Sequence, residues 1–248
     1  MRVKDHVLWH LDHDYTQPIR DPLWGHIYLT EGLVSIVDSI EFQQLSRIKQ
    51  LGPAHLVYPG ATHTRLAHSL GVYHIAYRMI RALLVSEETP TIDREMVSAY
   101  LCAALLHDLG HFPFTHSLKE LPLQEHEALA ADIVREGDLA RRIRDDLHTD
   151  PDLVARIIDE SLDDGARPEV RLFRRLLSGS LDPDKLDYLN RDAYFCGVPY
   201  GTQDIDFALS RLRPNGEDGI ALERSGISAV ENILFSKYLM YRAVYWHR

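Results

Sequence analysis

The stretch that most constrains the fold runs from Val97 to Leu106 and is apolar at nearly every position. A helix that is apolar all round has no face to turn toward water, so it must lie at the centre of the molecule. The chain continues directly into His107 and Asp108, whose side chains then need polar partners inside the protein. A metal ion is one such partner, because imidazole nitrogen and carboxylate oxygen together suit Fe, Mn, Zn, Ni or Mg.

Helical periodicity extends over most of the chain. One stripe of apolar residues predicts a helix of about 20 residues, and it consists of Leu66, Leu70, Tyr73, Tyr77, Ile80 and Leu84. Further amphipathic helices are predicted over residues 126–136, 151–162, 169–178, 186–195 and 230–244. Short strands are predicted at Trp24–Leu29, before a helix over Glu31–Asp38, and at Ile220–Leu222 as half of a small hairpin. The fold class is therefore mainly α with a few short β-strands.

No repeat, no flexible linker and no long charge block divides the 248 residues. A chain of this length can bury a full core as one unit, so we predict a single domain over residues 1–248. Within this domain, residues 21–60 form an N-terminal strand and helix portion. Residues 225–248 form a C-terminal helix that the sequence cuts short.

Composition limits the classes of partner. Lys and Arg number 27 and Asp and Glu number 37, which gives a formal net charge of −10. An acidic chain is a poor match for nucleic acid or an anionic membrane as its main partner. Two cysteines make no disulfide framework and no apolar run is long enough to span a membrane, so we expect a cytoplasmic location. The 14 histidines point to metal or acid–base chemistry.

Residues able to do chemistry follow the apolar helix. His107 and Asp108 are succeeded by His111 and His116. A single histidine at a helix end is usually a cap or a satisfied buried residue. Three histidines and an aspartate in so short a stretch favour a site instead. His111 would lie near the face of His107 if the helix continued for one more turn.

Two other segments carry residues of the same kinds. Arg65 and His68 lie three positions apart, so they share a face at the start of the long amphipathic helix. The segment 182–192 places four polar side chains on or beside one helical face, namely Asp184, Lys185, Tyr188 and Asp192. An N-capped helix facing solvent is the simpler interpretation, with Asp182 or Asp184 as the cap. That interpretation does not explain the whole set.

Together these segments match a known pattern. His68, the pair His107–Asp108 and Asp184 follow the order found in the HD-domain phosphohydrolase superfamily. Three longer strings resemble its deoxynucleoside triphosphate triphosphohydrolase branch: PGATHTRLAHSLGV, HDLGHFPFTHSL and DPDKLDYLNRDAYFCG. The resemblance begins near Asp21 and runs to the last residue. It implies that the fold is an HD-domain helical bundle.

The resemblance implies one divalent metal ion per site (Mn, Fe, Mg, Ni or Zn), with four protein ligands: His68, His107, Asp108 and Asp184. It implies hydrolysis of deoxynucleoside triphosphates to deoxynucleoside and inorganic triphosphate, by attack of metal-activated water on the α-phosphorus. One histidine would protonate the departing 5′ oxygen and the others would bind phosphate. The matching residues are His111, His116 and His126, with His116 favoured as the acid, and Glu127, which would orient a histidine or a water.

The resemblance also supplies candidates for substrate binding. Arg65, Lys185 and Lys237 would neutralise phosphates, and Lys237 stands where a vertebrate relative has arginine. Tyr188 would crowd the 2′ position and Asp192 would accept the 3′-hydroxyl, which selects deoxyribose. The remaining matches are Gln50 and Leu51 at the sugar edge, and Tyr241 and Tyr245 on the last helix, where Tyr245 is the better candidate to stack on the base.

One departure from the pattern concerns regulation. Asp38 and Gln43 match a site that holds an activating guanine nucleotide in the vertebrate relative, but Ser46 replaces its arginine. This replacement argues against activation of that type. We expect a homo-oligomeric enzyme whose partner is a nucleotide. The alternatives are another HD phosphohydrolase acting on monophosphates or phosphodiesters, a regulatory nucleotide-binding module, and a nucleic-acid-binding protein. The intact HD residues disfavour the second, and the negative charge disfavours the third.

Overall fold

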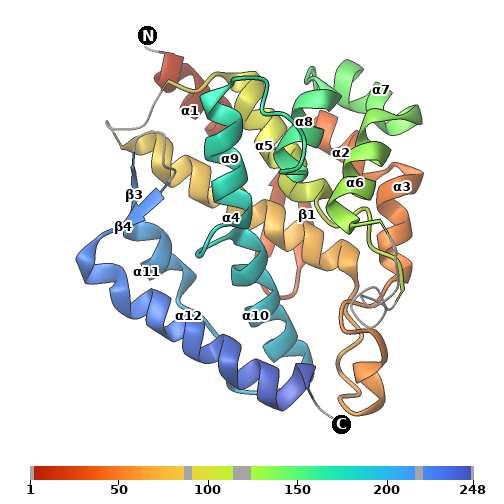
Figure 1. The fold of residues 1–248 in the computed structure, drawn as a ribbon, viewed down its shortest axis with the longest axis vertical. Helices are drawn as coiled ribbons and strands as arrows, with labels where there is room; N and C mark the ends of the chain where they lie inside the picture. Colours follow the sequence, from red (N-terminus) through yellow and green to blue (C-terminus); the bar gives the residue numbers. More distant parts are fainter. Residues whose placement is uncertain (1–2, 87–90, 114–123, 216–219, 247–248) are drawn as a thin grey trace.

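Two helices lie at the centre of the computed structural model, which describes residues 3–86, 91–113, 124–215 and 220–246 (Figure 1). Helices α4 (Arg65–Val85) and α5 (Arg94–Leu106) pack against each other, and α5 is buried from Ala99 to its end. Each begins at an extended N-cap whose side chain accepts a backbone N–H, Thr64 for α4 and Asp93 for α5. The predicted long helix and buried central helix are both confirmed.

Further helices cover this central pair. They are α6 (His126–Arg135), α7 (Gly137–Asp145), α8 (Pro151–Ile158), α9 (Pro168–Ser178) and α10 (Pro183–Cys196). Helix α10 packs along α4, α8 packs against α5, and both α6 and α9 pack against α8. Helix α10 begins earlier than predicted, because Asp182 caps it by accepting the N–H of Lys185 and Pro183 occupies its first turn.

The N-terminal part combines a hairpin with short helices. Strands β1 (Gln17–Asp21) and β2 (Gly25–Leu29) pair antiparallel, with Ile19 opposite Ile27. The other elements are α1 (Val3–His13), α2 (Glu31–Val37), α3 (Ile40–Gln43) and two 3₁₀ turns at Gln44–Arg47 and Gly52–Leu56. The strand and helix predicted for this part are confirmed. Helix α1 was not predicted, because only Val7 and Leu11 of its residues are buried.

The C-terminal part ends in a helix that changes its winding. Its elements are α11 (Ile205–Ser210), the antiparallel strands β3 (Leu212–Pro214) and β4 (Ile220–Leu222), a 3₁₀ turn at Arg224–Gly226, and α12 (Ile227–Met240). Residues Tyr241–Tyr245 form a π-helical turn rather than the α-helix predicted up to Val244. There the Trp246 N–H donates to the Tyr241 carbonyl at 2.8 Å, five residues back. Helix α12 packs on α10, so this turn lies close to the polar face of α10.

One hydrophobic cluster joins these parts. It takes in Leu33 of α2, Ile75 of α4, Leu105 of α5, Phe173 of α9 and Met240 of α12, all at most 1% exposed. The predicted mainly α fold with short strands is confirmed. No helix in the described part of the chain combines the length and apolar character needed to cross a membrane.

Candidate active site

The first turn of α4, the end of α5 and the first turn of α10 meet at one point. His68 Nε2 lies 3.0 Å from Asp184 Oδ1, and His107 Nε2 lies 4.0 Å from the same oxygen. Asp108 is adjacent, with Oδ2 3.8 Å from His68 Nε2 and Oδ1 3.4 Å from His107 Nε2. One ligand atom from each of His68, His107 and Asp184 can be chosen so that all three lie within 4.8 Å of one another. The four residues predicted as metal ligands are therefore brought together.

The hydrogen bonds of the two histidines suit a metal ion. The Nδ1 atom of His68 lies 2.8 Å from Asp187 Oδ2, and that of His107 lies 2.9 Å from the Ala104 carbonyl oxygen. Each Nδ1 therefore carries a proton and donates it. Both Nε2 atoms are buried and make no hydrogen bond within the described residues. They face carboxylate oxygens instead, and a divalent cation completes such a donor set.

The charges of these groups agree with that interpretation. Burial alone would lower the pKa of His68, but the adjacent carboxylates of Asp184 and Asp187 raise it to about 10. Burial alone would raise the pKa of Asp184, yet the adjacent His68 imidazole lowers it. The pocket thus holds ionised carboxylates that attract positive charge, and a bound metal ion would take the place of the proton on His68 Nε2.

Arg65 forms an ion pair with one of the candidate metal ligands. Its side chain is buried, and Nη1 donates to Asp108 Oδ2 at 2.6 Å. Burial would raise the pKa of Asp108, but the Arg65 guanidinium and the neighbouring His107 hold it well below its usual range. Arg65 was predicted to neutralise phosphate. In the structure it orients a candidate metal ligand.

The candidate acid–base residues lie beside the metal ligands. His111 Nδ1 lies 3.1 Å from Asp108 Oδ1, and the rings of His111 and His126 are 4.0 Å apart. This contact needs Gly110, because a Cβ there would lie 2.0 Å from the His126 carbonyl oxygen. His111 approaches through a turn, since α5 ends at Leu106 and does not continue as the spacing allowed.

Glu127 contacts the neighbouring His126. Its Oε1 lies 3.0 Å from His126 Nε2, and this hydrogen bond lowers the pKa of Glu127. Burial lowers the pKa of His111 to about 4, so that ring is neutral near pH 7. The ionised Glu127 carboxylate therefore holds the His126 ring beside a neutral His111. His116, the favoured acid, lies outside the described residues.

The second group of predicted residues lies further along α10. The Asp192 carboxylate receives His63 Nε2 on Oδ1 and the Tyr245 hydroxyl on Oδ2, both at 2.7 Å. Tyr188 faces Tyr245 edge-on, with ring centres 6.2 Å apart. Tyr188, Asp192 and Tyr245 are therefore brought together, and their roles toward the sugar and the base stay predictions.

Other predicted residues lie at the margin of this group. Lys185 Nζ contacts Asp182 and donates to the Gly179 carbonyl at 3.1 Å. Lys237 Nζ lies 5.9 Å from the centre of the Tyr241 ring, which is itself 5.1 Å from the Tyr245 ring. The Gln50 N–H donates to the His63 carbonyl, and Leu51 packs partly buried against the core. The Gln50 side-chain oxygen is buried and unbonded within the described residues.

Two buried residues of the site were missed from the sequence. His63 holds Asp192, and Asp187 holds His68. Asp187 lies three positions after Asp184 on α10, so helical spacing alone could have placed it near the metal ligands. His63 lies five positions before His68, outside the helix, and no periodicity indicates its role.

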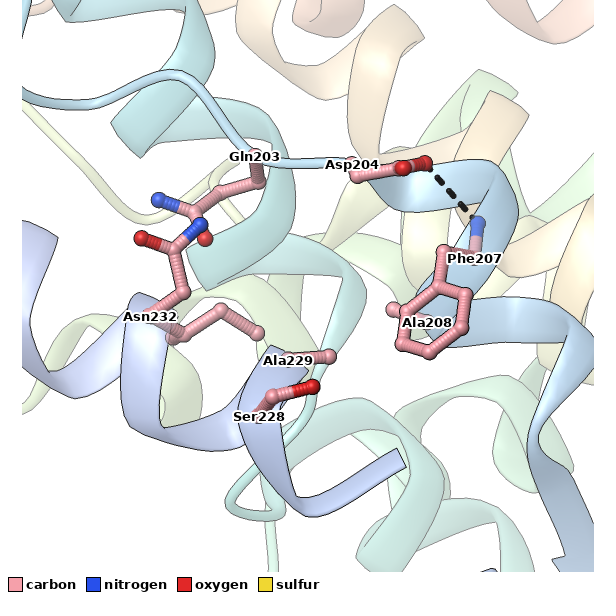
Figure 2. Close-up of a pocket in the computed structure, with 8 residues that line it drawn as sticks. Gln203, Asp204, Phe207, Ala208, Ser228, Ala229 and Asn232 are labelled. Atoms are coloured by element: carbon pink, nitrogen blue, oxygen red, sulfur yellow. Dashed lines mark hydrogen bonds between the residues drawn. The ribbon is translucent and has the colours of Figure 1, made fainter. Parts of the chain in front are cut away.

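Two hollows elsewhere on the molecule are distinct from this site. Figure 2 shows one between α11 and α12, where Asp204 accepts the Phe207 N–H and the Gln203 and Asn232 amides face each other. The other lies among α1, α2 and α5 and includes Arg94. Neither of these two pockets is lined by a residue of the predicted site.

Comparison with known proteins gives the class of this chain. The HD domain model matches residues 65–192, just over half of the sequence. The match begins at Arg65, ends at Asp192 and encloses all four candidate metal ligands. The chain belongs to the HD domain family, which confirms the resemblance inferred from the motifs.

Particular relatives extend the match beyond that range. The uncharacterised protein YwfO of Bacillus subtilis is 37% identical over 92% of this chain and 51% of its own length. The deoxynucleoside triphosphate triphosphohydrolase SAMHD1 of Danio rerio is 31% identical over 78% of this chain and 36% of its own. A phosphohydrolase structure from Bacteroides thetaiotaomicron, 34% identical, superimposes with a TM-score of 0.78 over 93% of this chain and 54% of that one. The chain spans about half the length of the first curated relatives that it matches.

Proposed function

We propose that this chain is a metal-dependent phosphohydrolase that converts deoxynucleoside triphosphates to deoxynucleoside and inorganic triphosphate. The observation that carries the proposal is the convergence of His68, His107 and Asp184, with both imidazole Nε2 atoms unbonded among the described residues. The Tyr188–Asp192 pair lies on the same helix as Asp184. In this proposal the metal centre would contact the phosphates and the Tyr188–Asp192 pair the sugar of the same nucleotide.

The metal ligands and their neighbours would have different roles in this reaction. His68, His107, Asp108 and Asp184 would hold the cation, which when bound polarises a phosphate oxygen and lowers the pKa of water. Arg65 holds Asp108 in place through the 2.6 Å bond to its Oδ2. His111 and His126 lie next to this centre and offer ring nitrogens to phosphate oxygens.

The departing 5′ oxygen needs a proton, because a free alkoxide is a poor leaving group. We assign that proton to His116, which follows His111 in the same segment. Glu127 orients His126 through their 3.0 Å contact, so His126 would donate to a phosphate oxygen. This division gives the two histidines different kinetic signatures.

Sugar choice would fall to α10. A bulky ring at Tyr188 leaves little room for a 2′-hydroxyl, and the Asp192 carboxylate can accept the 3′-hydroxyl. A related protein that matches this chain carries deoxynucleoside triphosphate triphosphohydrolase in its name. Deoxyribonucleotides are therefore the preferred class in this proposal.

A second candidate is an HD phosphohydrolase for nucleotides with fewer phosphates. It is favoured by the contacts of Arg65 and Lys185, each of which already pairs with a carboxylate, Asp108 and Asp182. Two cations predicted for the triphosphate tail are therefore already neutralised within the protein. A monophosphate or a phosphodiester carries less negative charge than a triphosphate, so it would need fewer unpaired cations in the site.

One assay separates the candidates. The purified chain is incubated with each dNTP, each NTP, dAMP and a dinucleotide, with Mn²⁺ or Mg²⁺ and with EDTA as the control, and the products are resolved by ion exchange. The proposal expects deoxynucleoside and intact triphosphate from dNTPs only, with no product in EDTA. Turnover of dAMP or the dinucleotide without dNTP turnover would support the second candidate. Release of orthophosphate or pyrophosphate from dNTPs would refute the first.

A further inference from the structure

A buried carboxylate behind His68 collects hydrogen bonds from three parts of the chain. Asp187 on α10 is 0% exposed. Its Oδ2 receives His68 Nδ1 and Arg191 Nε, both at 2.8 Å. Its Oδ1 receives Trp24 Nε1 at 2.5 Å and Arg191 Nη2 at 2.9 Å. Four N–H groups thus point at one carboxylate, which acts only as an acceptor.

The carboxylate is itself fixed by a second ion pair. Arg191 Nη1 donates to Asp21 Oδ2 at 2.9 Å, and both side chains are buried. Asp21 Oδ1 accepts the backbone N–H groups of Leu23 and Trp24 in the turn between β1 and β2. The network therefore runs from the β1–β2 hairpin through α10 to the first turn of α4.

This network packs closely against Gly71 of α4. A Cβ on Gly71 of α4 would lie 1.9 Å from Asp187 Oδ1 and 2.5 Å from Arg191 Nη2. The absence of a side chain at Gly71 is what lets α10 bring the carboxylate against α4. Interiors this dense hold their side chains in one rotamer, so Asp187 is held on the Nδ1 side of the His68 ring.

We propose that Asp187 is a positioning residue that fixes the ring orientation of His68 and keeps the proton on Nδ1, so that Nε2 presents its lone pair to the metal ion. Arg191 and Asp21 hold Asp187 in that place. The inference rests on the proposed function only in that His68 binds a divalent cation. Carboxylates behind metal-binding histidines typically act in this way.

The two histidines differ in what holds them. His107 donates its Nδ1 proton to the Ala104 carbonyl, a backbone group that no substitution removes. His68 donates to a side chain, so its support can be changed without touching the ligand. Asp187→Asn keeps the shape but places an NH₂ group against two of the four donors. If that group faces His68, Nδ1 must accept, the proton moves to Nε2, and the ring no longer binds a cation.

The test compares Asp187→Asn with Asp21→Asn. Both change one buried carboxylate of the same network to its amide, but only Asp187 touches His68. Mn²⁺ binding by equilibrium dialysis and the thermal midpoint are measured for each. We expect Mn²⁺ affinity to fall roughly 10–100-fold in Asp187→Asn and less than about 3-fold in Asp21→Asn, with the midpoint lowered in both. Equal Mn²⁺ affinity in Asp187→Asn and wild type, or equal losses in the two variants, would overturn the proposal.

A measurement on the wild type keeps the test independent of folding. ¹⁵N NMR of the Zn²⁺-loaded protein, with His68 identified by the signal missing in His68→Gln, reports which ring nitrogen carries the proton. We expect a protonated Nδ1 and a bound Nε2. A deprotonated Nδ1 on His68 would overturn the positioning role. A wild type that binds neither Mn²⁺ nor Zn²⁺ would refute the metal centre itself, which is a different failure.

Discussion

At its first turn, α10 presents Asp184 to two imidazole nitrogens that make no hydrogen bond among the described residues. Two turns later it presents Asp192, whose oxygens are bonded to His63 and Tyr245. We call these two regions the metal end and the sugar end. The same helix therefore carries one carboxylate beside two unbonded imidazole nitrogens and one whose two oxygens each accept a hydrogen bond.

This difference concerns the free energy of binding. A cation at the metal end gains contacts with buried nitrogens that make no hydrogen bond within the described residues, and it displaces only the proton on His68 Nε2. A sugar hydroxyl at the sugar end must take the place of a protein donor on Asp192. Substitutions at the metal end should therefore abolish function, and those at the sugar end should adjust affinity and selectivity.

The largest effect is expected at the metal end. His107→Ala removes one of two imidazole ligands, and dNTP turnover should fall by roughly 10³-fold or more, together with Mn²⁺ binding. Mn²⁺ dialysis and steady-state kinetics check this. His13→Ala on α1 is the matched control and should behave as wild type. Turnover by His107→Ala within about tenfold of wild type would remove the basis for a metal end.

The next effect concerns the proton donor. His116→Ala should lower kcat by roughly 10²–10⁴ with little change in KM, whereas His126→Ala should mainly raise KM. A p-nitrophenyl ester of thymidine 5′-phosphate needs no proton on its leaving group, so it should restore the rate of His116→Ala alone. Restoration of His126→Ala instead would reverse the two assignments.

The sequence predicted the central helices but not the side-chain contacts of Asp187 and Arg65. Periodicity is local, so it predicted α4, α5 and α10, and the family resemblance grouped the four metal-ligand candidates. The partners of Asp187 and Arg191 are Trp24 and Asp21, 163 and 170 positions away, and no spacing rule connects such residues. Charge and motif likewise could not show that Arg65 contacts Asp108, and its role toward phosphate stays a prediction.

The elements that were missed have a related cause. Helix α7 carries five charged residues in nine and buries only Leu139, Ala140 and Ile143. The π-helical turn at Tyr241–Tyr245 keeps the apolar content of a helix, so composition does not distinguish it from an α-helix. Its Tyr245 reaches Asp192 on a neighbouring helix, which only the packed structure reveals.

At the sugar end the expected effects are smaller. Tyr188→Ala should open space beside the 2′ position and reduce the preference for dATP over ATP by roughly tenfold. Competition assays with both nucleotides measure the ratio of their kcat/KM values, and Tyr194→Ala, an exposed aromatic on the same helix, is the control. An unchanged ratio in a folded Tyr188→Ala protein would argue against this role.

The smallest effect should have the opposite sign. Tyr245→Phe removes a donor that competes with the sugar for Asp192 Oδ2, so KM for dNTPs should fall about two- to fivefold, since one hydrogen bond is at stake. Steady-state kinetics check this, with the thermal midpoint measured alongside. A rise in KM would mean that the Tyr245 hydroxyl binds substrate directly rather than competing with it for Asp192.

The position of attack tests the account most directly. A dNTP is hydrolysed in H₂¹⁸O with Mn²⁺, and the products are analysed by ³¹P NMR and mass spectrometry. We expect ¹⁸O in the end phosphate of intact triphosphate and none in the deoxynucleoside, because water attacks the α-phosphorus and the 5′ oxygen leaves with its original isotope. Label in orthophosphate or pyrophosphate, beside a deoxynucleotide product, would contradict the proposed reaction.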